Sequence, residues 1–346
     1  MDEELTNREK TVLRHVVRDF IETATPVGSR FISKKHLQDL GLGSASVRNV
    51  MSDLEGLGYI DHPHTSAGRV PTDKGYRFYL DSLMQIEKIS GKDQKSIREN
   101  FDTTEDTERV LKEVSRLLGR ISRQLWVITP PSLNSGFFEK LELVSLVGHR
   151  IMVILSVRSG MVRTIMMEVA GEIPREKLED ISRSLNARLG GLSLKEIRDT
   201  FAERVRELQD DDTGLIRLFI ESVDKLFLPP KTDRIHIGGA QDIVEQPEFV
   251  NAEHFRSVIE LINNEEMIIH VLEKHGAQPD EVKVTIGEEN QEQKLRTYSV
   301  ITTSYAAGDA TGSIGVIGPK RMPYYRMIPL VDYVAHIVSD MFTNTK

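Results

Sequence analysis

The sequence predicts an α+β protein with several domains, and three observations lead to that prediction. The chain has 346 residues, which is longer than a single ordinary domain. Its first part has the pattern of three short helices followed by a β-hairpin, the order of a winged helix-turn-helix. Beyond it, segments with the pattern of strands lie on both sides of a helical stretch. That order indicates a strand-and-helix domain interrupted by an inserted domain.

Composition places the chain among soluble globular proteins. It is 39% hydrophobic and 28% charged, and no apolar run approaches membrane-spanning length. The acidic, polar start "MDEELTNREK" is unlike a signal peptide, so we expect a cytoplasmic protein without a membrane partner. The absence of cysteine excludes disulfides and thiolate metal sites.

Charge limits the kind of nucleic-acid binding that the chain could perform. The net charge of −8 argues against general polyanion binding by the whole chain. Residues 1–80 contain 11 Lys and Arg residues and 11 Asp and Glu residues, so the first domain is neutral. Any contact with DNA there must depend on where the charges lie.

Three helices are predicted in the first domain. The first runs from its cap at Thr6 to the segment before Pro26, because the residue preceding a proline avoids the helical conformation. Ser33 is expected to cap the second helix, which stops near residue 41. Ser44 is expected to cap the third helix, which Gly58 ends.

The third helix has an unusual outer face. Its apolar residues recur at helical spacing and predict one buried side. A solvated face usually carries Glu and Lys, which are better helix formers than small polar residues. This face instead carries Ser44, Ala45, Ser46, Arg48, Asn49 and Ser52.

These residue types fit a helix that lies in the major groove of double-stranded DNA. Arg48 is suited to guanine O6 and N7, and Asn49 to adenine N6 and N7. Ser44 and Ser46 are short enough to meet phosphate, and Ala45 lets the backbone approach closely. The alternative is a three-helix bundle whose outer face is simply solvated.

The segment "YIDHPHTSAGRVPT" at 59–72 predicts a strand, a polar tip and a returning strand, which together form a wing. Its tip offers hydrogen-bond donors for a phosphate or a minor groove, namely His64, Thr65, Ser66 and Arg69. His62 and His64 could suggest a metal, but no acidic or thiol ligand follows at a suitable spacing. A metal site is therefore not predicted.

Nothing in the remaining sequence indicates catalysis or a cofactor. "GDATGSIGVIG" at 308–318 is rich in glycine but lacks the Gly-Lys-Ser/Thr ending of a phosphate loop, and it leads from strand to strand. A tight hairpin explains it better. No Ser/His/Asp set or pair of carboxylates stands out, so we do not expect an enzyme.

Several stretches closely resemble the HrcA family of bacterial heat-inducible transcription repressors. The matching segments are "TPVGSR", "LGSASVRNVMSDLEGLGYI", "HPHTSAGRVPTDKGYRFYLD", "EQPEF" at 245–249 and "GSIGVIGPKRMPYYRMIPLVDYVA" at 312–335. Gly56 departs from the family, because many members carry an acidic residue there. Residues 172–240 match least.

The resemblance implies a domain organisation and a function. It implies a winged-helix domain over 1–88, a linker over 89–105, a GAF-like domain over 106–171 and 251–346, and an inserted dimerising domain over 172–250. It also implies a homodimer that represses chaperone operons by binding the CIRCE inverted repeat, with the GroEL chaperonin holding it in its active form. The alternative function is a winged-helix repressor whose GAF-like domain senses a small-molecule effector.

The inserted domain supplies the candidate dimer surface. "LIRLFIESVDKLFL" at 215–228 is apolar almost all round, as in a helix buried in a core or an interface. We take an interface as the hypothesis because a small inserted domain has little core of its own. Leu218 and Leu226 represent this surface.

Overall fold

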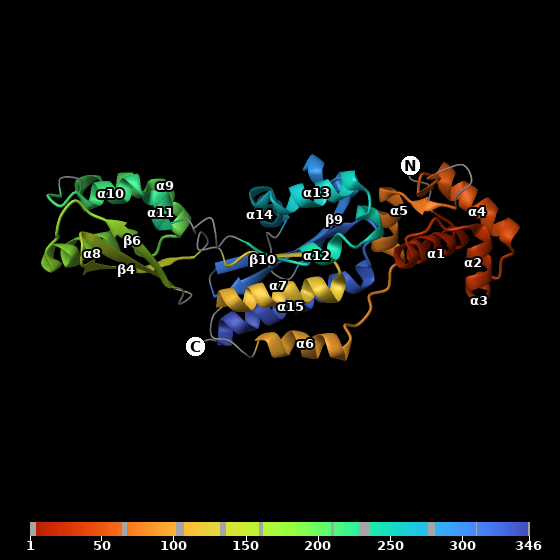
Figure 1. Ribbon diagram of the computed structural model, residues 1–346, viewed down its shortest axis with the longest axis horizontal. Coiled ribbons are helices and arrows are strands. Elements are labelled where there is room, and N and C mark those ends of the chain that lie inside the picture. Colours follow the sequence, from red (N-terminus) through yellow and green to blue (C-terminus); the bar gives the residue numbers. More distant parts are fainter. Residues whose placement is uncertain are drawn as a thin grey trace.

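The structure is a computed structural model that describes residues 5–63, 68–101, 107–131, 136–158, 162–208, 211–227, 235–275, 281–308 and 310–344. It is a mixture of helices and antiparallel sheets, which confirms the α+β prediction. Three units follow one another along the long axis (Figure 1). We call them the N-terminal unit (5–84), the middle unit (91–131 and 235–344) and the inserted unit (136–227).

The N-terminal unit contains the predicted helices and hairpin. Its elements are α1 (Asn7–Thr23), α2 (Ser29–Lys35), α3 (Leu37–Leu40), α4 (Ser44–Gly56), β1 (Ile60–Asp61), β2 (Val70–Pro71), α5 (Asp73–Phe78) and a π-helical turn, η1 (Tyr79–Leu83). The predicted capping box of the first helix is present, since Thr6 and Glu9 bond each other's backbone N–H groups.

Two predicted helix caps are wrong. Ser33 lies inside α2, where its hydroxyl donates to the carbonyl oxygen of Leu42 at 2.9 Å. Ser44 is the first residue of α4, and Gly43 occupies the capping position without any side-chain hydrogen bond. Several small polar residues or glycines stand in a row at each start, so the sequence does not single out which of them is the cap.

The middle unit is a three-layer structure. Its five antiparallel strands run in the order β7-β3-β10-β9-β8, and helices cover both faces of the sheet (Figure 1). The alternate residues of β3 divide between two apolar clusters, with Trp126 on the α7 and α15 side and Val127 on the α13 and α14 side. The elements are α6 (Gly91–Phe101), α7 (Thr107–Ser122), β3 (Leu125–Ile128), β7 (His236–Gly238), α12 (Ala240–Ile243), η5 (Pro247–Phe249), α13 (Ala252–Ile262), α14 (Glu265–His275), β8 (Lys283–Ile286), η6 (Gly287–Glu289), η7 (Gln293–Leu295), β9 (Tyr298–Ala307), β10 (Ala310–Pro319) and α15 (Tyr324–Asn344).

Most of the predicted linker is a helix held against the middle unit. Ile97 of α6 is fully buried in the cluster that α7 and α15 share. Asp93 pairs with Arg326 of α15 at 3.0 Å, and the Arg98 guanidinium donates to the Tyr333 hydroxyl at 3.0 Å. This docking was not predicted because residues 89–105 are mostly polar. One apolar anchor and two polar contacts are enough to hold α6 in place.

The inserted unit has its own sheet and its own core. Its elements are β4 (Phe138–Leu146), β5 (Arg150–Val157), β6 (Val162–Glu168), α8 (Arg175–Leu189), α9 (Leu194–Arg204), η3 (Arg206–Leu208), α10 (Leu215–Glu221) and α11 (Val223–Phe227). The buried residues of these strands and helices form one apolar cluster, separate from those of the middle unit.

This grouping corrects the boundaries assigned from sequence. The strands at 138–168, placed with residues 106–171 in one domain, form the three-stranded sheet β4-β5-β6 with the helices of the inserted unit. Conversely, β7 lies within the predicted insert, yet it pairs with β3, with Trp126 opposite Gly238. A strand pattern shows that a strand exists, but it does not show which sheet the strand joins.

The N-terminal unit is docked on the middle unit through polar and apolar contacts. Asp73 pairs with Lys320 at 2.7 Å, and the Arg77 guanidinium binds the Glu289 carboxylate and donates to the Val284 carbonyl at 2.8 Å. Buried apolar residues of both units belong to one continuous cluster. In the described part of the chain, no helix is long and apolar enough to cross a membrane.

Candidate DNA-binding surface

Helix α4 packs on α1 and α2 through one apolar face and leaves the other in solvent. Val47 and Leu54 are fully buried, and Val50 and Met51 are nearly so. The turn before α4 places Gly41 at a left-handed φ of 60°, a conformation that costs glycine little. The short turn therefore sets α4 against the helix that precedes it.

The predicted base-reading residues lie on the solvent face of α4. Ala45, Ser46, Arg48, Asn49 and Ser52 are exposed and Ser44 is half-exposed. Their side chains make no hydrogen bond or ion pair with any described residue. A guanidinium and an amide that are free of internal partners lose nothing within the protein when they bind another molecule.

The carboxylate of Glu55, near the end of α4, holds both sides of the hairpin. One of its oxygens bonds His62 Nδ1, next to β1. The other accepts from Arg69 Nε at 2.9 Å and pairs with Nη2 at 2.7 Å. The hairpin register, Ile60 opposite Pro71, is thereby tied to α4. We call these three residues the Glu55 clamp.

Arg69 is therefore placed differently from the expectation of a free DNA contact. Its side chain is only 18% exposed and its guanidinium is engaged by Glu55. Its backbone pairs with that of Val27, which lies so close to Gly68 that a Cβ there would come within 2.5 Å of a backbone carbon. The other predicted wing residues, His64, Thr65 and Ser66, lie outside the described residues.

A buried charged network fixes α2 and α3 to α1. Asp19 is 1% exposed and accepts from Lys35 Nζ at 2.5 Å and bonds His36 Nε2 at 2.9 Å. His36 stacks on His15 at 3.8 Å between ring centroids, and His15 bonds Asp39 at 2.7 Å. Burial lowers the pKa of His15. Sequence reasoning missed this network, although His15 and Asp19 are spaced i, i+4 beside the apolar stripe of α1.

The neutral total of the N-terminal unit does not show which of its cations are unpaired. Asp19, Asp39 and Glu55 are used in ion pairs, each with a cation of the same unit. Arg30 and Lys34 of α2 are exposed, and neither pairs with a described residue. These two cations were not among the predicted site residues, although they lie on a helix that packs against α4.

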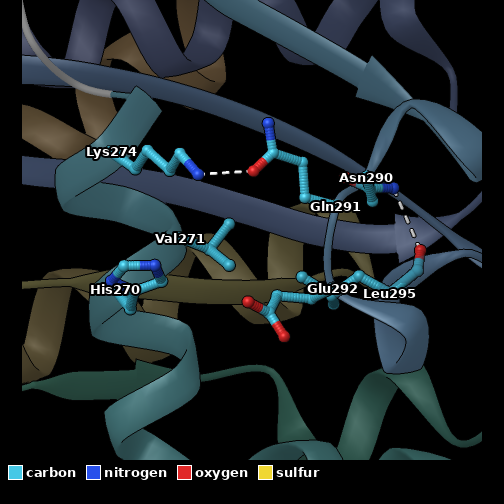
Figure 2. A pocket seen from close by; sticks show the side chains of 7 residues that line it. All are labelled: His270, Val271, Lys274, Asn290, Gln291, Glu292 and Leu295. Atoms are coloured by element: carbon cyan, nitrogen blue, oxygen red, sulfur yellow. Dashed lines mark hydrogen bonds between the residues drawn. The ribbon is translucent and has the colours of Figure 1, made fainter.

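The described residues form no metal site, and the hollow beside α14 is too small for an effector. No group of three or more described His, Asp or Glu side chains is arranged to hold a metal ion. Figure 2 shows a hollow between α14 and residues 290–295, where Lys274 donates to Gln291 and Asn290 donates to the Leu295 carbonyl at 3.0 Å. Asn290 also donates to the carbonyl of Tyr298. The volume of the hollow is about 10 Å³, which is enough for about one water.

The predicted dimer residues lie mostly inside the inserted unit. Leu226 is 1% exposed in its core, and Leu218 is half-buried against the same cluster. Leu226 therefore cannot form a surface that pairs with another chain. The apolar character of residues 215–227 is explained by burial in the unit's own core, which is larger than the sequence predicted because the three strands contribute to it.

Comparison with known proteins places these features in a family. Residues 108–328 match the model of the HrcA protein C terminal domain. The chain is 40% identical to the heat-inducible transcription repressor HrcA of Chlorobium phaeobacteroides (strain BS1) over 98% of this chain and 99% of the relative. It is 41% identical to the protein of the same name from Prosthecochloris aestuarii, over 99% of this chain and 98% of the relative.

The fold also matches a solved structure over its whole length. A crystal structure described as that of a hypothetical protein aligns with a TM-score of 0.60 and 26% identity, covering 99% of this chain and 100% of the other. The sequence and family matches together identify the chain as a member of the HrcA family of heat-inducible transcription repressors.

Proposed function

We propose that this protein represses chaperone operons as a homodimer that binds the CIRCE inverted repeat through its N-terminal unit. We assign that unit as a winged helix-turn-helix, with α4 as the recognition helix and the β1–β2 hairpin as the wing. The observation that carries the proposal is that no described residue pairs with Arg48 or Asn49, which lie on the exposed N-terminal half of a helix whose other face is buried.

We assign some residues of this α2–α4 surface to base contacts and others to contacts with the DNA backbone. Arg48 reads guanine and Asn49 reads adenine, each through two hydrogen bonds in the major groove. Ser44, Ser46 and Ser52 meet phosphates near the helix, and Ala45 leaves room for the DNA backbone. Exposed Arg30 and Lys34 on α2 add phosphate contacts, because the first helix of such a pair crosses the DNA backbone.

The wing contributes through its tip and is positioned by the Glu55 clamp. His64, Thr65 and Ser66 supply donors to a phosphate or the minor groove. Arg69 is anchored to Glu55, so it acts chiefly by holding the wing at a fixed angle to α4. Any remaining donor capacity of its guanidinium adds to backbone binding.

We infer that two copies associate through the open face of the β4-β5-β6 sheet. The helices of the inserted unit cover its other face, and the open face carries Val144 at 37%, Met166 at 45% and Val162 at 62% exposure. Met152 lies between the first two, opposite Val144 on one side and Met166 on the other. The cross-strand row Val144, Met152 and Met166 is a partly exposed apolar patch, which favours an interface. It replaces Leu218 and Leu226 as the candidate.

The middle unit is assigned as GAF-like, and the active form is held by the GroEL chaperonin. The family relationship supports both assignments. We further propose a cytoplasmic location and no catalytic activity, in keeping with transcription repressors as a class.

A footprint on a chaperone-operon promoter tests the proposal. Purified protein should protect both halves of the inverted repeat from nuclease, and added GroEL should raise the protected fraction. A duplex with one half-site scrambled is the matched control and should be protected weakly, because the second half-site then no longer benefits from a high effective concentration. Equal protection of a scrambled duplex would refute sequence-specific repression through this operator.

A further inference from the structure

A cleft of about 320 Å³ lies between the N-terminal unit and the middle unit. Its walls are largely apolar, with Phe20, Val70 and Pro71 from the first unit and Phe249 and Pro319 from the second. The volume is at the lower end of the roughly 300–1,000 Å³ of small-molecule sites. A cleft of this size fits a small organic molecule and not a folded segment of protein.

One wall residue, Tyr76, has a hydroxyl that no described residue engages. Tyr76 is 2% exposed, and it makes an edge contact with the ring of Tyr324. No described residue forms a hydrogen bond with its hydroxyl. The hydroxyl is not one of the fully enclosed polar atoms that lack a partner, so it reaches the cleft and can donate to a molecule bound there. Burial also raises the pKa of the phenol well above its usual value, so the hydroxyl remains a donor.

The charged residues of the cleft point to the same kind of ligand. Lys320 donates to Asp73 at 2.7 Å, and an ammonium has two more N–H donors to offer. Glu248 is held by Arg321, with Nε to carboxylate oxygen at 2.5 Å, and Arg321 further donates to the Ile21 carbonyl at 2.6 Å. Arg321 thus neutralises the Glu248 carboxylate, and Lys320 keeps N–H donors for a bound molecule.

We infer that this cleft binds a small aryl or alkyl carboxylate, with its apolar body between the two units and its carboxylate on the Tyr76 hydroxyl and the Lys320 ammonium. The site is complete only when the N-terminal unit is docked on the middle unit, since each contributes one wall and one donor. By linkage, the ligand stabilises this docked arrangement and so couples a metabolite to the placement of α4.

Calorimetric titration of the full-length protein with 3-phenylpropionate tests the inference. The probe has a ring for the apolar walls and a carboxylate for the two donors. We expect saturable binding, and binding of the neutral 3-phenylpropanol at least about tenfold weaker, because a hydrogen bond to a charged group is worth about that factor. An absence of saturable binding at millimolar concentrations would overturn the proposal.

Three variants locate the bound probe. Tyr76→Phe removes only the hydroxyl and should weaken binding about tenfold, and Lys320→Gln should do the same. Tyr79→Phe is the matched control, because Tyr79 is a similarly buried tyrosine outside the cleft, and it should leave binding unchanged. Equal affinity for Tyr76→Phe, Lys320→Gln and the native protein, all with native circular dichroism, would place the probe elsewhere and refute the site.

Discussion

Replacing Arg48 with alanine isolates base reading from every other role of the N-terminal unit. The Arg48 side chain is exposed and has no partner among the described residues, so its loss leaves no buried group unpaired and removes no packing. Stability should change by less than about 0.5 kcal/mol. Binding to the inverted repeat should weaken by about 1–3 kcal/mol per half-site, the worth of one bidentate contact to guanine.

A competition assay with specific and scrambled duplexes measures the effect. For Arg48→Ala, only the specific affinity should fall appreciably, and the slope of log K against log salt should stay near its native value. Arg30→Ala is the matched control, since it removes a cation assigned to phosphate and should lower both affinities together while reducing the slope by about one. Should Arg48→Ala behave like Arg30→Ala, the base-reading assignment would be refuted.

Three further predictions follow from the clamp, the inserted unit and the histidine network. Arg69→Ala and Glu55→Gln should lower DNA affinity to a similar extent, and the double variant should lower it no further. If the slope of log K against log salt falls by about one in Arg69→Ala alone, Arg69 contacts a phosphate directly. Leu226→Lys should unfold the inserted unit, because it leaves an unpaired charge in a core. Met166→Lys should instead leave thermal stability near native and yield monomers in sedimentation. Native dimerisation of Met166→Lys would rule out the open sheet face as the interface. Because the pKa of His15 is lowered in the folded protein, the unfolded chain takes up a proton first, and the free energy of unfolding should fall as pH drops below 6.5. His15→Gln should flatten that decline in denaturant titrations. An unchanged pH dependence would refute this role.

Helix α4 and its partly exposed face could be predicted from sequence because their signals are local. The apolar residues from Val47 to Leu54 repeat at helical spacing, and the composition of the other face is legible without knowing the fold. The Glu55 clamp could not be predicted in the same way. Its members lie 7 and 14 residues from Glu55, and a glutamate near the end of a helix is ordinarily a solvated one.

The fold of the remaining chain shows where local pattern stops being informative. The strand β3 is buried on both faces, whereas β5 alternates between buried and less buried residues, which marks a sheet covered on one side. The sequence does not show this difference, because residues 151–155 are as continuously apolar as residues 125–128. The pairing of β7 with β3 has no local signal either, because it joins segments more than 100 residues apart.

The position of the units bears on how the proposed DNA binding would depend on the proposed association of two copies. The proposed DNA surface and the proposed dimer surface lie on units at opposite ends of the long axis (Figure 1). The N-terminal and middle units share one apolar cluster and are further held by Asp73, Arg77 and Arg321, so α4 has a fixed direction on the middle unit. The inserted unit has a separate cluster. A packed core resists continuous deformation, so we expect α4 to keep its direction on the middle unit when the protein binds the proposed operator.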